Sequence, residues 1–445
     1  MTMRSPLHKQ RGGITLMVIL SLTALLAVAG LAFSAGLAYM IKAKLNSATD
    51  AAGLAAARAI SIGINQTEQT ANAKAAAQRF FQANFPANYL MANATLNDVG
   101  VSFTGGEATI TVSASATMPT ALFGGFQTGP MSPGVLTETK RKDLDMIVTL
   151  DTSGSLSGQA ANVRSSAITF LNQFNVDRDR IGLVHFAFGS VIDDAIRPTA
   201  RGFDRASMIS HIKSYSFEGS TASPEGMWTA RQQINSVPTA NLNRSNLRVI
   251  VFFSDGAPNS FGTYLTWKNT LDCVKAGTIA TDDDGSGAPY GLYDLGKTYD
   301  DLGGGCTPDN LPNKASALPD WYNGHGLLDR EFPVITTSPR TVTKELTYKN
   351  VNRAARNLVE AMAAKSRDEG IYVFTLGLGA SLKSGTGYDG EKGEDTLKCM
   401  ANSADAPARC AVPNKQVGVY CYAATQADLT PCFSKLASAI LRISK

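Results

Sequence analysis

The chain has 445 residues, which is more than one hydrophobic core usually supports, so at least two structural units are expected. A composition of 44% hydrophobic and 18% charged residues is typical of a folded protein and argues against a disordered chain. The 41 basic and 37 acidic residues are spread along the sequence without a concentrated basic stripe, so nucleic acid is not an expected partner.

An uninterrupted apolar stretch, residues 14–41, lies near the N-terminus and contains no charged side chain. A helix of this length, rising about 1.5 Å per residue, exceeds the roughly 30 Å hydrocarbon core of a bilayer. We predict a transmembrane helix over residues 14–41, preceded by a cytoplasmic tail over residues 1–13. A cleaved signal peptide is the alternative, but its apolar region would be shorter and a small-x-small cleavage site would follow it.

The cysteines indicate which side of the membrane the larger part of the chain occupies. Six of them fall in the second half without any C-x-x-C pair: Cys273, Cys306, Cys399, Cys410, Cys421 and Cys432. An even number without metal spacing favours disulfides, which persist in oxidising compartments, over six buried thiols. Basic residues flank both ends of the apolar stretch and only slightly favour a cytoplasmic N-terminus. With the cysteines, they predict a large domain in the periplasm or outside the cell.

Residues 42–123 are predicted to form a helical stalk followed by a small β unit. The stretch from Lys42 to Leu90 is rich in Ala, Gln, Asn and Lys and has no proline before Pro86, which favours long helices. From Val101 to Met118 polar and apolar residues alternate, which is typical of strands with one buried face. A linker rich in glycine and proline at its start is expected over residues 124–140.

Residues 141–445 show the rhythm of a doubly wound, mainly parallel α/β sheet. Four short apolar runs are separated by amphipathic helical patterns: Met146–Leu150, Ile181–Phe186, Val249–Phe253 and Ile371–Leu376. Runs that are apolar on both faces indicate strands covered on both sides by helices. A long segment rich in Gly, Asp, Pro and Tyr, at about residues 259–347, interrupts this rhythm and is read as an insertion, which Cys273 and Cys306 are placed to staple. Six cysteines allow 15 pairings, so the other connections stay open.

Polar residues follow two of these runs, at the sheet edge where ligands bind in such folds. Asp151, Ser153 and Ser155 come directly after the first run, and Asp255 follows the third. Alternate residues of a tight loop turn a carboxylate and two hydroxyls toward one point, and these are the hard oxygen ligands that Mg²⁺ or Mn²⁺ requires. Between the two runs, Thr221 lies in a polar loop before a helix and offers a third hydroxyl. The alternative is that these residues only cap helices or brace loops, because Ser and Asp favour helix starts and Ser223 is the better placed cap.

The pattern Asp151-x-Ser153-x-Ser155, followed by Thr221 and by Asp255-Gly256, resembles the von Willebrand factor A (vWA) family. The resemblance implies a vWA fold with a metal-ion-dependent adhesion site (MIDAS). In such a site those five side chains hold Mg²⁺, with Mn²⁺ and Ca²⁺ as alternatives, directly or through water. Two carboxylates neutralise a dication, and neutral hydroxyls leave it electrophilic. An Asp or Glu of a protein partner is therefore the expected sixth ligand.

The two ends of the chain resemble TadG-like proteins of Flp (tight adherence) pilus assembly. The matching residues are Gly12-Gly13, the stretch Lys42-Ala43-Lys44-Leu45-Asn46-Ser47-Ala48-Thr49-Asp50-Ala51-Ala52, and the closing Leu441-Arg442-Ile443-Ser444-Lys445. This resemblance implies a single-pass protein of the bacterial inner membrane that acts in pilus assembly or envelope adhesion with other envelope proteins.

The sequence leaves two other functions open as alternatives. In a minor pilus-tip adhesin or structural subunit, the apolar helix would pack into a filament instead of remaining in the bilayer. In a hydrolase, Ser153 or Ser155 would be the nucleophile, but neither lies in a G-x-S-x-G elbow, and His185 sits within an apolar run. A metal hydrolase would use His or several carboxylates around an open water site. A non-enzymatic binding protein is therefore expected.

Overall fold

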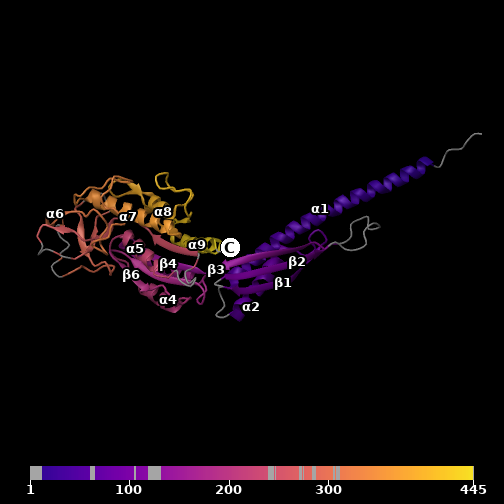
Figure 1. The fold of residues 1–445 in the computed structure, drawn as a ribbon, viewed down its shortest axis with the longest axis horizontal. Coiled ribbons are helices and arrows are strands. Elements are labelled where there is room, and N and C mark those ends of the chain that lie inside the picture. The colour runs from indigo at the N-terminus through magenta and orange to yellow at the C-terminus, as the bar shows by residue number, and fades with distance from the viewer. Residues whose placement is uncertain are drawn as a thin grey trace, which may run out of the picture. The chain divides into compact units, whose positions relative to one another are not determined.

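A computed structural model describes residues 13–60, 66–104, 107–118, 132–238, 247–269, 275–282, 287–303 and 311–443, and the single residues 245, 273 and 306. The chain divides between Arg141 and Lys142 into two compact units, which we call unit 1 and unit 2. In Figure 1, unit 1 is coloured indigo to magenta and unit 2 magenta to yellow. The tail predicted at 1–13 lies outside the described residues except for its last residue.

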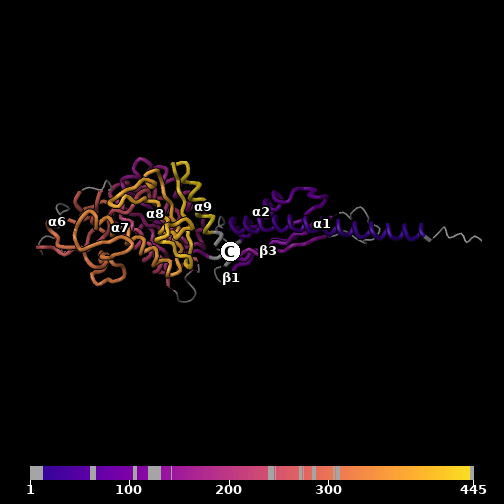
Figure 2. Tube along the Cα trace, turned by 90° about the horizontal axis from the view of Figure 1, so that it is seen from above, coloured from indigo at the N-terminus to yellow at the C-terminus, as the bar shows by residue number. Residues whose placement is uncertain are grey.

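Unit 1 is built on one long helix, α1 (Gly13–Ala59), which Figure 2 shows as a continuous coil. Its first part is long and apolar enough to cross a membrane, and its large apolar side chains from Ile14 to Met40 are exposed except for Leu37, which is partly buried. From Ile41 onward one face is buried, with Leu45, Ala48 and Ala52 contacting the rest of the unit. The predicted span and the start of the predicted stalk are therefore one helix with two differently exposed parts.

The rest of unit 1 packs against the second part of α1. Helix α2 (Gln66–Asn84) lies beside α1, and strands β1 (Asn93–Thr104) and β2 (Glu107–Thr117) form an antiparallel hairpin whose inward residues include Ile110 and Val112. The alternation at Val101–Met118 correctly predicted strands, but it identified only part of β1. A third strand, β3 (Gly134–Lys142), extends the sheet in the order β1-β2-β3.

The linker predicted at 124–140 is wrong in its later part, because β3 occupies it; residues 124–131 lie outside the described residues. The hydropathy of the sequence does not reveal β3, because most residues on its buried face are polar. Thr137 Oγ1 donates to Thr49 Oγ1 over 2.9 Å, and Arg141 Nη1 donates to the Ala57 carbonyl over 3.2 Å. Thr139 lies so close to Gly53 of α1 that a Cβ there would come 2.5 Å from its hydroxyl.

Unit 2 is centred on a six-stranded sheet in the order β16-β13-β7-β4-β5-β6. Its strands are β4 (Leu144–Asp151), β5 (Arg180–Phe186), β6 (Ser190–Asp194), β7 (Leu247–Ser254), β13 (Ile371–Leu378) and β16 (Tyr420–Ala423). All neighbouring pairs are parallel except β5 and β6, so β6 is an antiparallel edge strand. The predicted doubly wound, mainly parallel fold is confirmed, and each of the four apolar runs is a strand.

Helices cover both faces of this sheet because successive strand residues point to opposite sides. Val148 and Val251 belong to one core with α3 (Ala160–Leu171), α4 (Arg205–Ser214) and α9 (Leu429–Ile443). Ile147 and Ile250 belong to the other core, with α5 (Ser223–Asn235), α7 (Tyr348–Asp368) and α8 (Gly393–Ala401). On each face, the hydrophobic core extends over several neighbouring strands. This packing fixes the positions of the strand ends relative to one another.

In its described residues, the insertion predicted at about 259–347 contains two small antiparallel sheets. Strands β8 (Ser260–Thr263), β10 (Gly277–Ala280) and β11 (Tyr290–Tyr293) form one sheet in the order β11-β10-β8. Strand β9 (Thr266–Trp267) pairs with β12 (Ala315–Ala317), which follows the short helix α6 (Leu311–Lys314). Phe261, Ile279 and Leu292 join the α5 and α7 core, so the insertion shares a hydrophobic core with the main sheet.

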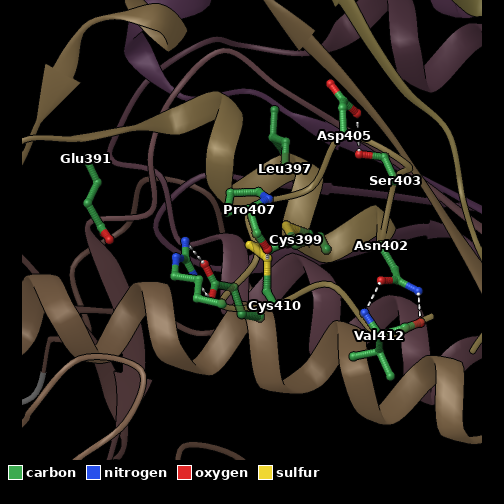
Figure 3. Close-up of a disulfide and its surroundings, with 12 residues drawn as sticks. Glu391, Leu397, Cys399, Asn402, Ser403, Asp405, Pro407, Cys410 and Val412 are labelled. Atoms are coloured by element: carbon green, nitrogen blue, oxygen red, sulfur yellow. Dashed lines mark hydrogen bonds and ion pairs between the residues drawn. A yellow bond between two sulfur atoms is a disulfide. The ribbon is translucent and has the colours of Figure 1, made fainter. Parts of the chain in front are cut away.

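All six cysteines form disulfides within unit 2: Cys273–Cys306, Cys399–Cys410 and Cys421–Cys432. The first closes the insertion, as expected. The second, drawn in Figure 3, ties the end of α8 to the loop that follows it. In that loop Asn402 Nδ2 donates to the Val412 carbonyl, and Arg409 pairs with the buried Glu360 of α7 through both guanidinium amino groups. A strand pair, β14 (Gly385–Thr386) and β15 (Glu391–Lys392), precedes α8.

We expect Phe433→Ala to lower the free energy of unfolding of unit 2 by roughly 3–5 kcal/mol, because it leaves a cavity in a closed core. Phe433 is fully buried, and its ring centroid lies 5.2 Å from that of Phe170 in α3. Urea unfolding followed by tryptophan fluorescence measures this change, since Trp228, Trp267 and Trp321 all lie in unit 2. Leu328→Ala is the control, because Leu328 is 86% exposed and its removal should leave the urea midpoint unchanged.

Candidate metal site

Asp151 and Asp255 are brought together by the pairing of two parallel strands. Strand β4 ends at Asp151 and pairs with β7 so that Leu150 lies opposite Phe253, which places the start of both following loops at the same sheet edge. Both carboxylates are buried, with Asp151 fully covered and Asp255 6% exposed. Two buried carboxylates at one edge repel each other and are poorly solvated, so the arrangement favours a bound cation.

The Asp151 side chain is oriented by hydrogen bonds to both of its oxygens. Asp151 Oδ1 accepts from the Ser153 backbone N–H over 2.8 Å, and Oδ2 accepts from Ser254 Oγ over 2.6 Å. The first bond curls the loop back on itself, which turns the side chains of Ser153 and Ser155 toward the same side as the carboxylate. The loop therefore has the shape expected from its alternate polar residues.

The hydroxyls of this loop reach the second carboxylate. Ser153 Oγ lies 3.2 Å from Ser155 Oγ, and Ser155 Oγ donates to Asp255 Oδ1 over 2.8 Å. Neighbouring oxygens around an octahedral Mg²⁺, with metal–oxygen bonds of 2.0–2.1 Å, are about 2.9 Å apart. The observed spacings are close to this value, so these three oxygens fit adjacent positions around one small cation.

Thr221 joins the site from a third loop. Gly154 N donates to the Gly219 carbonyl over 3.1 Å, which ties the Thr221 loop to the Asp151 loop. A Cβ added at Gly256 would lie 3.3 Å from Thr221 Oγ1, so the hydroxyl adjoins the residue that follows Asp255. The structure thus brings all five predicted residues to one place, from three loops that are far apart in the sequence.

The alternative of helix capping does not account for these side chains. The 3-10 helix η3 (Gly154–Gln159) follows Ser153 directly, yet Ser153 makes no side-chain cap hydrogen bond to it. Helix α3 begins at Ala160 after Gln159, which also lacks a side-chain cap. Ser223 is not the cap of α5 but its first residue, after Ala222. The hydroxyls are therefore not used to satisfy helix ends.

Two further residues support the site and were not predicted. Ser254 ends strand β7 directly after the apolar run Val249–Phe253, and a polar residue at that position was the available signal. Asn259 accepts from the Thr221 backbone N–H over 3.0 Å, and no sequence pattern marked it. Within the described part of the chain, no group of three or more His, Cys, Asp or Glu side chains is placed to hold a metal. The candidate ligands are therefore the two carboxylates and three hydroxyls.

Two known families match parts of the chain. Residues 145–281 match the von Willebrand factor type A domain, and residues 12–59 match the Flp pilus-assembly TadE/G-like family, named Tad. Residues 145–281 are therefore identified as a vWA domain, the class that the sheet and loop arrangement define. More particularly, residues 12–59 are similar to the TadE/G-like segment of Flp pilus-assembly proteins. A search of the curated proteins gave no match.

Several solved structures resemble the chain at low sequence identity. The pilus adhesin SpaC from Lactobacillus rhamnosus GG is 12% identical, with a TM-score of 0.41, and the match covers 79% of this chain and 35% of the adhesin. The chain thus spans about a third of the length of that adhesin. The vWF domain of the type V pili tip protein Mfa5 from Porphyromonas gingivalis is 16% identical, with a TM-score of 0.37, and the match covers 68% of this chain and 97% of that domain. Proximal thread matrix protein 1 from the mussel byssus, with a zinc-occupied MIDAS motif, is 13% identical, with a TM-score of 0.32. The match covers 67% of this chain and 46% of the byssus protein.

We expect Ser254→Ala to weaken divalent-cation binding by about tenfold, since outer partners of metal ligands contribute this much to affinity. The substitution removes the donor to Asp151 Oδ2 without changing a predicted ligand. Titration calorimetry with Mn²⁺ on the full chain in detergent measures the effect. Ser366→Ala is a matched control, because Ser366 is also fully buried but donates to the Met362 carbonyl inside α7. Equal affinities in the two variants would contradict a role for Ser254.

Proposed function

We propose that unit 2 binds one divalent cation, with Mg²⁺ as the expected ion, and uses it to bind a protein partner without catalysing a reaction. The ligands would be Asp151, Ser153, Ser155, Thr221 and Asp255. The observation that carries this proposal is the convergence of three separate loops on one point, where Ser155 Oγ donates a hydrogen bond to Asp255 Oδ1. Both carboxylates are buried, as expected of groups whose charge a cation balances.

The chemistry of the five side chains supports capture of an acidic group. Two carboxylates match the charge of a dication, and three neutral hydroxyls add coordination without further negative charge. The bound ion would therefore keep the ability to accept one more oxygen ligand. An Asp or Glu side chain of a partner protein has the required hardness and charge. The ion would then act as a bridge between the two proteins.

The histidines support a non-enzymatic role. Each of the three outside the leading tail contacts an acid that is not a predicted ligand: His185 with Asp193, His211 with Asp194, and His325 with Glu225. A serine hydrolase needs a base within hydrogen-bond reach of its nucleophile. These three contacts lie at other elements, so they do not supply a base to Ser153 or Ser155.

The TadE/G-like match at residues 12–59 and the apolar part of α1 support a membrane anchor. We place the protein in the bacterial inner membrane with its N-terminus in the cytoplasm and unit 2 in the periplasm or outside the cell. Three disulfides in unit 2 support this orientation, because they persist in an oxidising compartment. The corresponding role is metal-dependent protein binding in Flp pilus assembly or envelope adhesion.

Replacing either carboxylate should remove most of the affinity for the metal ion. In titration calorimetry of the full chain in detergent, we expect the wild type to bind one Mg²⁺ or Mn²⁺. Asp151→Asn and Asp255→Asn should lose most of this affinity, since each removes half of the negative charge that balances the ion. Asp320→Asn, which changes an exposed carboxylate paired with Lys344, should bind as the wild type does. Failure of the wild type to bind either ion would refute the proposal.

Cell fractionation tests the anchor. We expect the full chain to remain in the membrane pellet after alkaline carbonate extraction, because a spanning helix is removed only by detergent. Protease added to spheroplasts should digest unit 2, whereas protease added to intact inside-out vesicles should leave it whole. Recovery of the protein with sheared filaments would instead favour the pilus subunit. Digestion of unit 2 only in inside-out vesicles would indicate the opposite orientation in the membrane.

A further inference from the structure

Asn259, the first residue of the insertion, hydrogen-bonds to the Thr221 loop through both its side chain and its backbone. Its side-chain Oδ1 accepts from the Thr221 backbone N–H over 3.0 Å and also from the Ser220 hydroxyl. Its own backbone N–H donates to the Thr221 carbonyl over 3.3 Å. Asn259 is 6% exposed and Thr221 4% exposed, so water competes little for these bonds.

The same asparagine is fixed in turn by the insertion sheet. The Asn259 carbonyl accepts from Thr281 N over 3.0 Å and from Thr281 Oγ1 over 3.1 Å. Thr281 directly follows β10, whose Ala280 lies opposite Ser260 of β8. Asn259 therefore lies at the end of a two-strand ladder, and its position depends on that ladder.

A second part of the insertion supports the other flank of Thr221. Ala222 N donates to the Ala187 carbonyl over 2.9 Å, so the turn after β5 holds the residue that follows Thr221. Phe188, in that turn, donates its backbone N–H to the Thr298 carbonyl over 3.0 Å and stacks on Tyr293 with ring centroids 3.5 Å apart. Insertion residues thus contact the supports on both sides of the threonine.

These contacts restrict the backbone of Thr221, and thereby its hydroxyl. Removing the Asn259 side chain would leave a buried backbone N–H and a buried hydroxyl without their acceptor, which destabilises that loop conformation. The loop would then sample other positions, and Thr221 Oγ1 would be less often placed beside Gly256. The Asp151 loop would be little affected, since Ser254 and its own backbone hold its carboxylate.

We propose that Asn259 is a positioning residue for the metal site, and that the insertion sets the cation affinity by holding Thr221 in place. This inference rests on the proposed function, because Thr221 must be a ligand for its position to affect binding. The insertion would then be an integral part of the binding site and not an appendage to the vWA sheet.

The test compares Asn259→Ala, Asn259→Asp and the control Asn323→Ala in the full chain in detergent. Asn323 is a matched residue of the insertion: its Oδ1 accepts from Tyr264 N over 2.9 Å and from Thr263 Oγ1 over 3.2 Å, away from the site. Calorimetry with Mn²⁺ should show a loss of about 10–100-fold for Asn259→Ala, the usual range for partners of metal ligands. Asn259→Asp keeps an acceptor oxygen for both bonds, so it should retain wild-type affinity or exceed it.

A second measurement does not depend on the metal. Hydrogen exchange in the metal-free protein should be faster at the 219–222 segment in Asn259→Ala, and unchanged there in Asn323→Ala and Asn259→Asp. If wild type binds Mn²⁺ and Asn259→Ala binds equally well, the proposal is overturned while the metal site stands. If the wild type itself does not bind, the metal site and this proposal fall together. Equal affinity losses in Asn259→Ala and Asn323→Ala would also overturn it, because they would indicate general destabilisation.

Discussion

The parallel pairing of β4 with β7 is the constraint on which the site depends. It places Asp151 at the end of β4 and Asp255 directly after the adjacent strand β7, where both carboxylates are buried and Ser155 of the Asp151 loop reaches Asp255. Strands paired in this way cannot slip by one residue without turning their apolar side chains to the wrong face. Because helices cover both faces, such a slip would disrupt two cores at once. The stability of the sheet therefore offsets the electrostatic cost of holding two negative charges together.

Helix α1 shows how one element meets two different environments. Up to Met40 its large apolar side chains are exposed except for Leu37, which suits a surrounding of lipid. Beyond Ile41 the buried positions recur at three- and four-residue spacings and are mainly alanine, as at Ala48, Ala52 and Ala56. Small side chains let α2 and β3 approach the helix closely, and the contact of Thr139 with Gly53 is the extreme case. The alanine-rich composition is thus a packing requirement of unit 1 and not only a mark of helical propensity.

The apolar runs and the five candidate ligands were predicted from sequence because each depends on a local pattern. A strand covered on both faces is continuously apolar, and a D-x-S-x-S loop directly follows the first of these strands. Strand β3 escaped because its inward residues are largely polar and hydrogen-bond to α1, over 80 residues earlier in the chain. The pairing of Cys399 with Cys410 and of Cys421 with Cys432 was open because four cysteines at equal intervals permit several connections. Asn259 escaped for a similar reason, since its acceptor role exists only once the insertion has folded beside Thr221.

Each of the three ligand loops is braced by a residue from outside the motif, and each brace comes from a different element. Ser254 of β7 holds the Asp151 carboxylate, Asn259 of the insertion holds Thr221, and Ser381, in the 3-10 helix η5 (Ala380–Lys383) after β13, donates to the Asp255 carbonyl over 3.3 Å. Candidate ligand groups held in this way are already ordered without an ion, so a cation that bound to them would cost little conformational entropy. The geometry of the site is consequently a property of the whole of unit 2. This explains why a D-x-S-x-S sequence alone is weak evidence for a metal site. The same residues at the end of a buried strand, with braces from β7, the insertion and η5, form a coherent candidate site.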